Sequence, residues 1–352
     1  MSTPLNILKD VDQVCLSAFK SISIKSNGDS LYVGPCCVVE PGMLTTQGID
    51  FEKHALLEQI RESWKHGEVY SECQRCKQLE AAGLPNAKTG IDSTIKDYYT
   101  SGRTPPATSW DDIYKPDLLR MDYWVGDMCN LACVTCGPKN SSLWRQILQY
   151  PKSQQKITTN NFWDKVDFSK LLDVHIHGGE PFLSREHVEF IQAIPNKHKV
   201  GLAYNTNGTV RPSPQVFEIW QEYNRVNLDF SFDDIGDRFE YLRWPAKWDQ
   251  ALDTFDYILN KIGPNSSINI YIVDSVLNNP YLTEIKDWWK NNHPTDAYNQ
   301  PIRVEVIPAG GNWGVADLSK DWWLETLDLR DQQYSQGWRD LFPRSIDNVL
   351  HP

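Results

Sequence analysis

Three cysteines, Cys129, Cys133 and Cys136, crowd into the short stretch DMCNLACVTCGP. The 352-residue chain has eight cysteines, and none follows Cys136. A structural zinc site usually closes a tetrahedron of four ligands, whereas a cubane iron–sulfur cluster has four irons that each usually take one thiolate. Three thiolates would leave one iron open to an external ligand. The loop therefore predicts an iron–sulfur cluster, with a zinc site completed by His175 or His177, or chance clustering, as the alternatives.

A second pattern, HGGEP, ends the next predicted strand and contains Gly178, Gly179 and Glu180. The two glycines have no Cβ, so a ligand can approach their backbone closely. The Glu180 carboxylate can then hold an ammonium group. Its place one β/α unit after the three-cysteine loop makes this turn informative as a candidate binding site.

The other five cysteines all precede residue 118, and they are Cys15, Cys36, Cys37, Cys73 and Cys76. Cys73 and Cys76 have the C-x2-C spacing with which two thiolates can grip one metal centre. Because side chains alternate along a strand, Cys36 and Cys37 are not expected to serve one cluster. We predict a second site of Cys15, Cys36, Cys73 and Cys76, with Cys37 as the alternative to Cys36, and with either iron–sulfur or zinc as its metal.

These residues need elements that position them, and six predicted strands alternate with helices after residue 118. The strands are expected at 118–126, 171–179, 199–209, 226–234, 267–277 and 302–310, and the helices at 142–150, 184–194, 212–223, 248–263 and 282–292. This alternation predicts a parallel sheet with right-handed crossovers. Six units fit an α/β fold with a partial (β/α)6 TIM-like barrel, whose C-terminal rim would carry the three-cysteine loop.

The residues before the barrel are predicted to form a small cysteine-rich α+β module. Residues 21–37 favour a strand–turn–strand hairpin with its turn at 26–29, and residues 51–68 predict an amphipathic helix that ends near Gly67. The expected domains are therefore 1–118 for the module, 119–315 for the barrel and 316–352 for a C-terminal helix and tail.

Composition and charge narrow the possible partners. With 35 basic against 46 acidic residues the net charge is −11, which argues against a nucleic-acid partner. No stretch approaches the roughly 18 apolar residues of a membrane span, and the N-terminus lacks a signal-peptide pattern. The sequence predicts a cytoplasmic protein with no membrane partner, whose clustered cysteines are metal ligands or catalytic groups rather than disulfides.

C-x3-C-x2-C after one strand and G-G-E-P after the next together resemble the radical S-adenosylmethionine (radical SAM) enzymes. The similarity covers about 119–315, through YNTNGT (204–209), LDFSFDD (228–234), FEYLRW (239–244) and VEVIPAG (304–310). It implies a barrel of radical SAM type, with a catalytic [4Fe-4S] cluster on Cys129, Cys133 and Cys136 that binds S-adenosylmethionine at its open iron. It also implies reductive cleavage of S-adenosylmethionine to a 5′-deoxyadenosyl radical, which abstracts hydrogen from the substrate.

The resemblance also implies which residues contact S-adenosylmethionine. The methionyl amino group is expected at Gly178, Gly179 and Glu180, the methionine end at Asn207, the ribose at Ser231 and Asp233, the methionyl carboxylate at Arg243, and the adenine side at Pro308 and Gly310. The residue before the third cysteine is often aromatic in the family and is Thr135 here. No adenine packing is therefore expected from that position.

The N-terminal cysteine pattern resembles the auxiliary-cluster module called twitch, and part of the larger SPASM module. Such modules usually follow the barrel, whereas this one precedes it. The resemblance implies a second, fully ligated cluster of the same four-iron type that relays electrons or shapes the substrate pocket.

The leading hypothesis from this resemblance is a redox-active peptide or protein maturase with a flavodoxin- or ferredoxin-like electron donor. The first alternative is a radical SAM dehydrogenase or rearrangement enzyme that acts on a small metabolite or sugar. The second is a non-catalytic metal-binding interaction protein. The absence of a cysteine after Cys136 disfavours epimerases that use a late cysteine thiol as hydrogen donor.

Overall fold

The computed structural model of the protein describes residues 13–27, 30–39, 42–44, 50–83, 86–150, 162–308, 331 and 337–345. The chain divides into two compact units, which we describe separately. The first unit comprises Met1–Trp124, Ser153–Ile176 and Glu189–Gly201, and the second comprises Val125–Lys152, His177–Val188 and Leu202–Pro352. The domain boundaries expected from the sequence stay predictions.

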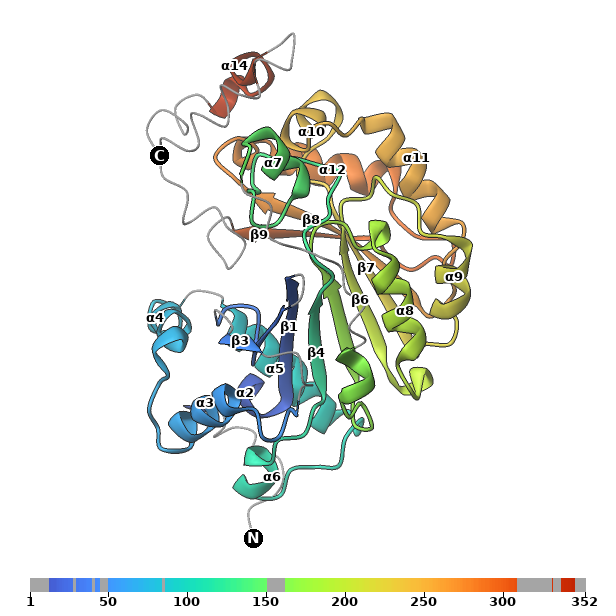
Figure 1. Cartoon of the computed structure of the whole chain (residues 1–352). Coiled ribbons are helices and arrows are strands. Elements are labelled where there is room, and N and C mark those ends of the chain that lie inside the picture. Colours follow the sequence, from blue (N-terminus) through green and yellow to red (C-terminus); the bar gives the residue numbers. More distant parts are fainter. Residues whose placement is uncertain are drawn as a thin grey trace. The chain divides into compact units, whose positions relative to one another are not determined.

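The first unit is built on strands in the order β3-β2-β1-β4-β5 (Figure 1). Strand β1 pairs antiparallel with β2 and parallel with β4, with Ile24 opposite Val33 on one side and Tyr123 on the other. The predicted hairpin is thereby confirmed, and it extends the sheet that contains the first barrel strand; Gly28 and Asp29 of its turn lie outside the described residues. The strands are β1 (Ser21–Asn27), β2 (Ser30–Gly34), β3 (Gly42–Leu44), β4 (Arg120–Trp124) and β5 (Asp173–His177).

Short helices complete the first unit. They are α2 (Ser17–Lys20), α3 (Ala55–Lys65), α4 (Gln74–Ala81), α5 (Ala87–Thr100) and α6 (Trp110–Tyr114). Helix α3 confirms the helix predicted over 51–68 but begins later, because the Asp50 carboxylate accepts the Glu52 and Lys53 backbone N–H groups and holds a turn there.

Helix α5 was not expected from the sequence. A capping box between Asn86 and Thr89 begins it, and Ile91, Ile95 and Tyr98 bury one of its faces in the core. The helix contains several weak helix formers, so its sequence did not predict a helix. Burial of the apolar face in the core, more than intrinsic helix propensity, therefore stabilises it.

The second unit carries strands in the order β6-β7-β8-β9 (Figure 1). Strands β7, β8 and β9 pair in parallel, with Phe230 opposite Ile270 and Tyr271 opposite Glu305. Helices cover one face, where the Phe230 ring lies 4.9 Å from the Phe255 ring of α11. The strands are β6 (Gly201–Thr206), β7 (Arg225–Ser231), β8 (Ser266–Asp274) and β9 (Arg303–Pro308).

The helices that alternate with these strands follow the predicted order. They are α7 (Ser142–Ile147), α8 (Arg185–Ala193, between β5 and β6), α9 (Pro214–Trp220), α10 (Gly236–Leu242), α11 (Trp248–Leu259) and α12 (Leu282–Asn292). Only α10 was not expected as a helix. The prediction of an α/β fold with a mostly parallel sheet is confirmed, and six strands in the predicted ranges are consistent with a partial TIM-like barrel.

The expected C-terminal helix and tail over 316–352 lies largely outside the described residues. Within 337–345, helix α14 (Trp338–Leu341) is followed by the buried Phe342, whose ring lies 5.8 Å from that of Tyr241. No helix among the described residues is long and apolar enough to cross a membrane.

Arg61 is the buried charge that fixes α3 in the first unit. Its guanidinium donates to the backbone carbonyl oxygens of Ala18 (3.0 Å), Glu52 (2.9 Å) and Phe51 (2.7 Å). Burial lowers the pKa of Arg61 to about 10. The side chain thus ties α3 both to α2 and to the turn before it.

Replacing Arg61 with Met is expected to lower the free energy of unfolding by about 3 kcal/mol, because buried carbonyl oxygens lose their donor. Urea unfolding followed by circular dichroism measures the change. The exposed Lys53 gives the control, since Lys53→Met should stay within about 0.5 kcal/mol of wild type. Equal midpoints for both variants would contradict the assigned role of Arg61.

Candidate functional site

The three-cysteine loop follows β4 and belongs to the second unit. The start of α7 holds its backbone on one side. Cys129 N donates to Ser142 Oγ (3.0 Å), and Ser142 Oγ donates to Cys129 O (3.1 Å). The Trp144 indole Nε1 donates to Cys133 O (2.8 Å). The loop is therefore fixed by side chains of a helix that begins a few residues after it.

The end of α10 holds the same loop from another direction. Ala132 N donates to Trp244 O (2.7 Å), and Val134 N donates to Leu242 O (2.8 Å). Cys133, which lies between them, is buried, whereas Cys129 and Cys136 are half-buried. The backbone that carries the first two thiols is therefore anchored both by α7 and by the end of α10.

The Gly178–Glu180 turn lies directly on the backbone that leads into this loop. Gly179 N donates to Gly126 O (2.9 Å), and Glu180 N donates to Met128 O (2.8 Å). A Cβ on Gly178 would stand 2.6 Å from Gly126 O, and one on Gly179 would stand 2.2 Å from Met128 O. The sequence predicted a close approach of a ligand to these glycines, whereas the structure shows a close approach of the backbone at Gly126 and Met128.

Glu180 is fully buried and joins the end of β5 to the end of β6. Its carboxylate accepts hydrogen bonds from Asn207 N (2.8 Å), Phe182 N (3.2 Å) and the Thr206 hydroxyl (3.0 and 3.1 Å). Burial raises the pKa of Glu180 to about 7, against the effect of these donors and of the Arg243 charge. The predicted contact to a methionyl ammonium would therefore add to a network that the chain already supplies.

Asn207 connects β6 to the three-cysteine loop. Its Nδ2 donates to Asn130 Oδ1 (2.9 Å) and lies 4.0 Å from Cys129 Sγ, while its Oδ1 accepts from Thr209 N (2.9 Å). Asn130 Nδ2 donates in turn to Thr209 Oγ1 (2.8 Å). The amide thus reaches the first cysteine with an N–H group.

Asp233 and Arg243, predicted for the ribose and the methionyl carboxylate, form a buried ion pair with each other. Arg243 Nη2 lies 2.8 Å from Asp233 Oδ2, and the other Asp233 oxygen accepts from Val273 N (3.0 Å). The Nη1 group of Arg243 lies 3.9 Å from Cys133 Sγ. A guanidinium charge is therefore fixed beside the middle cysteine.

The remaining predicted positions are less connected. Ser231 ends β7 and is half-buried, and Pro308 ends β9. Gly310 lies outside the described residues. His175, an alternative fourth zinc ligand, lies in the first unit with its Nδ1 3.5 Å from Asp122 Oδ1. His177 is buried at the end of β5, and its carbonyl accepts from Val125 N (2.9 Å).

The charges of the loop suit a bound metal cluster. Burial and the neighbouring Cys133 thiol raise the pKa of Cys129 to about 12, so a thiolate there needs a positive partner. Asn207 and Arg243 turn N–H groups toward the sulfur atoms of Cys129 and Cys133. Among the described residues, no three His, Cys, Asp or Glu side chains converge as ligands of a single ion; in a cubane each thiolate binds its own iron.

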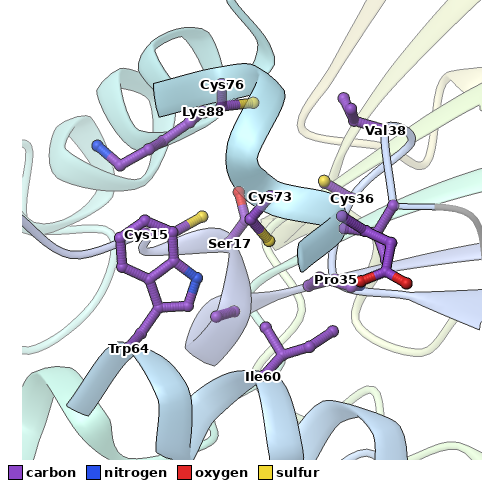
Figure 2. Close-up of a pocket in the computed structure, with 13 residues that line it drawn as sticks. Cys15, Ser17, Pro35, Cys36, Val38, Ile60, Trp64, Cys73, Cys76 and Lys88 are labelled. Carbon is purple, nitrogen blue, oxygen red and sulfur yellow. The ribbon is translucent and has the colours of Figure 1, made fainter. Parts of the chain in front are cut away.

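Four of the N-terminal cysteines border one pocket of the first unit (Figure 2). Cys15, Cys36, Cys73 and Cys76 are all buried in it. Burial raises the pKa of Cys36 to about 12 and that of Cys73 to about 11. The empty space among the side chains is only about 10 Å³, roughly that of one water molecule, so the thiols would have to turn apart to admit a cluster.

Cys37 belongs to a different environment from its neighbour Cys36. Cys36 lines the pocket, whereas Cys37 is half-buried and interacts with the charges of Asp122 and Arg120 on β4. Both residues lie beyond the end of β2, in a bend and a turn, so strand alternation is not what separates them.

Several residues that hold the candidate site were not singled out from the sequence. Thr206 and Asn130 complete the networks of Glu180 and Asn207, and Ser142 and Trp144 anchor the cysteine loop. The motif YNTNGT contains Thr206, so its polar residues at a strand end were a signal. Nothing in the spacing of Trp144 marks it as an anchor.

A protein-family model matches the segment of the chain that contains this site. Residues 125–279 match the model of the Radical SAM superfamily. No curated protein matches the chain. The matched segment contains the three-cysteine loop, the Gly178–Glu180 turn, Asn207 and Arg243, so the resemblance to radical SAM enzymes is confirmed over this segment.

Solved structures of low similarity include native anSMEcpe with bound AdoMet, at 15% identity and a TM-score of 0.39, over 64% of this chain and 62% of that one. They also include Streptococcus suis SuiB bound to S-adenosylmethionine, at 13% identity and a TM-score of 0.35, over 89% of this chain and 68% of that one. The chain thus spans 62% of the length of the anSMEcpe chain. These scores are too low to establish a shared fold or activity.

Replacing Gly179 with Ala is expected to displace the three-cysteine loop, because its Cβ would overlap the Met128 carbonyl. We expect a loss of about 1–3 kcal/mol in unfolding free energy and reduced iron content after anaerobic reconstitution. Gly137→Ala is the matched control in the same loop, since no atom lies within 4 Å of its added Cβ. If both variants retain the same stability and iron, the backbone contact is not essential.

Proposed function

We propose that the protein is a radical SAM enzyme that reductively cleaves S-adenosylmethionine and abstracts hydrogen from a peptide or protein side chain. The observation that carries the proposal is the juxtaposition of the three-cysteine loop with the Gly178–Glu180 turn inside the segment that matches the superfamily. Three thiols without a local fourth suit a cluster with one open iron.

The residues of the chain would hold both groups in the second unit. Cys129, Cys133 and Cys136 would ligate the cluster, and the N–H groups of Asn207 and Arg243 would stabilise the thiolate charge. When bound, the reduced [4Fe-4S] cluster would supply one electron that breaks a C–S bond of S-adenosylmethionine, giving methionine and a 5′-deoxyadenosyl radical. A flavodoxin- or ferredoxin-like protein would supply the electron.

Predicted contacts to S-adenosylmethionine are part of this proposal. The carboxylate of Glu180 and the backbone of Gly178 and Gly179 would face the methionyl amino group. Asp233 neutralises Arg243, so Arg243 would offer the methionyl carboxylate a donor of fixed direction more than an uncompensated charge. Ser231, Pro308 and Gly310 keep their predicted roles on the ribose and adenine sides.

The pocket of Cys15, Cys36, Cys73 and Cys76 is proposed to hold an auxiliary iron–sulfur cluster. Four buried thiols around one space support the proposal. A second observation also fits. The buried indole Nε1 of Trp64, which borders the pocket, has no hydrogen-bond partner, and cluster sulfur atoms accept such donors. A cluster with four thiolates has no open iron, so its chemistry would be electron transfer or support of the substrate pocket.

The first experiment removes the proposed catalytic ligands. Anaerobically reconstituted wild type, reduced and given S-adenosylmethionine, is expected to form 5′-deoxyadenosine. The variant with Cys129, Cys133 and Cys136 all replaced by Ala should form none and should lose about four irons per chain. Mass spectrometry of the nucleoside and iron and sulfide assays measure both. The proposal is wrong if wild-type protein binds no iron or does not form 5′-deoxyadenosine.

The substrate class is tested separately. Deuterium transferred into 5′-deoxyadenosine from a labelled peptide would support the maturase, whereas transfer from a labelled sugar or small metabolite would support the alternative enzyme.

Ligands of the auxiliary site are distinguished by paired variants. In the background that lacks the three catalytic cysteines, replacing Cys73 and Cys76 with Ala is expected to remove the remaining iron. Cys37→Ala should leave it unchanged, because Cys37 does not line the pocket. Zinc in place of iron, or an equal loss with Cys37→Ala, would contradict the assignment.

A further inference from the structure

Trp64 is a buried donor without an acceptor at the edge of the cysteine pocket. It lies in the last turn of α3, is 3% exposed, and borders the pocket (Figure 2). Its indole Nε1 is shielded from solvent and has no hydrogen-bond partner. An unsatisfied buried donor costs about 1–3 kcal/mol, and buried polar groups in proteins are rarely left so. The pocket therefore contains an N–H group that needs an acceptor.

The indole is held firmly in this position. Arg61 on the same helix ties α3 to Ala18, three residues after Cys15. Ile60 borders the pocket one turn before Trp64, and the Lys77 ammonium lies 5.3 Å from the Trp64 ring centroid. The Arg61 contact to α2 and the Lys77 contact from α4 thus fix the ring at the pocket wall.

The Trp64 indole and the Cys73 thiol border the same pocket (Figure 2). Most other residues that line the pocket besides the cysteines are apolar or small, among them Ala18, Pro35 and Val39. Charged groups are confined to Glu72 and Lys88, and the Lys88 ammonium pairs with Glu80 (2.8 Å) and Asp92 (3.3 Å).

We propose that Trp64 is a tuning residue whose indole N–H donates a hydrogen bond to a sulfur atom of the auxiliary cluster. This rests on the proposed auxiliary cluster. Reduction adds an electron whose charge spreads over the sulfur atoms, so a donor to sulfur stabilises the reduced form more than the oxidised form. Hydrogen bonds to sulfur are among the factors that set cluster potentials. Trp64 would therefore raise the reduction potential of this cluster.

The test uses the full chain with Cys129, Cys133 and Cys136 replaced by Ala, so that only the auxiliary cluster remains. Trp64→Phe keeps the aromatic ring and removes the N–H. Trp110→Phe is the matched control, since Trp110 lies on α6, is 38% exposed and does not border the pocket. Iron content is measured first, and a redox titration monitored by electron paramagnetic resonance then gives the midpoint potential.

Trp64→Phe is expected to retain the iron of its parent and to shift the midpoint potential downward, making reduction up to about tenfold less favourable, which is 59 mV for a one-electron couple. Trp110→Phe should match the parent. An unchanged potential in iron-loaded Trp64→Phe overturns the inference while the auxiliary cluster stands. A parent without iron overturns both, and is recognised at the first measurement.

A second measurement needs no substitution at Trp64 and decides the case if that variant does not load iron. The same parent is produced with ¹⁵N in the indole ring of tryptophan, and its reduced cluster is examined by pulsed paramagnetic resonance. A ¹⁵N coupling to the cluster is expected. Its absence from a loaded, reduced cluster would overturn the inference.

Discussion

The contact between two stretches of backbone governs the candidate site. Gly178–Glu180 lies against 125–128 so closely that a single Cβ on either glycine would overlap a carbonyl oxygen. Two hydrogen bonds, from Gly179 N and Glu180 N, close the contact. Cys129 follows at once, so the position of the first thiol depends on a turn some fifty residues later in the chain. A glycine pair is the chemical solution because only it lets two main chains approach to this distance.

The second constraint is the cost of burying charged side chains, and the site reduces this cost by pairing each of them with groups of the same chain. Glu180 receives three donors from its own turn and from β6, and Asp233 receives Arg243 and Val273 N. A buried carboxylate or guanidinium without such partners would be costly. The same partners also fix the directions in which the Arg243 and Asn207 side chains point. Arg243 and Asn207, held by Asp233 and Thr209, are left with N–H groups near Cys133 and Cys129.

The two cysteine sets differ in how they are built. The catalytic candidates share one loop, so sequence spacing alone brings them together, and helices α7 and α10 then hold its backbone. The N-terminal four come from separate elements, and their pocket forms where α2, α3, α4 and the segment after β2 meet. Asp92 of α5 contributes to that packing by accepting the Leu16 and Ser17 N–H groups beside Cys15. The convergence of these four cysteines consequently depends on the fold more than that of the loop cysteines does.

The sequence by itself determined the alternation of strands and helices and the spacing of Cys129, Cys133 and Cys136, because periodicity and spacing are local properties. It predicted from strand alternation that Cys36 and Cys37 would not serve one cluster, but both residues lie beyond the end of β2 and not on a strand. Only the tertiary structure decided that Asp233 and Arg243 pair with each other, that Glu180 is enclosed by Thr206 and Asn207, and that β1 joins β4 in one sheet. It alone revealed α5 and the unpartnered indole of Trp64. These features depend on contacts between residues that are distant in sequence. Such contacts form because apolar side chains are buried and because buried polar groups require hydrogen-bond partners. A local sequence pattern does not specify them.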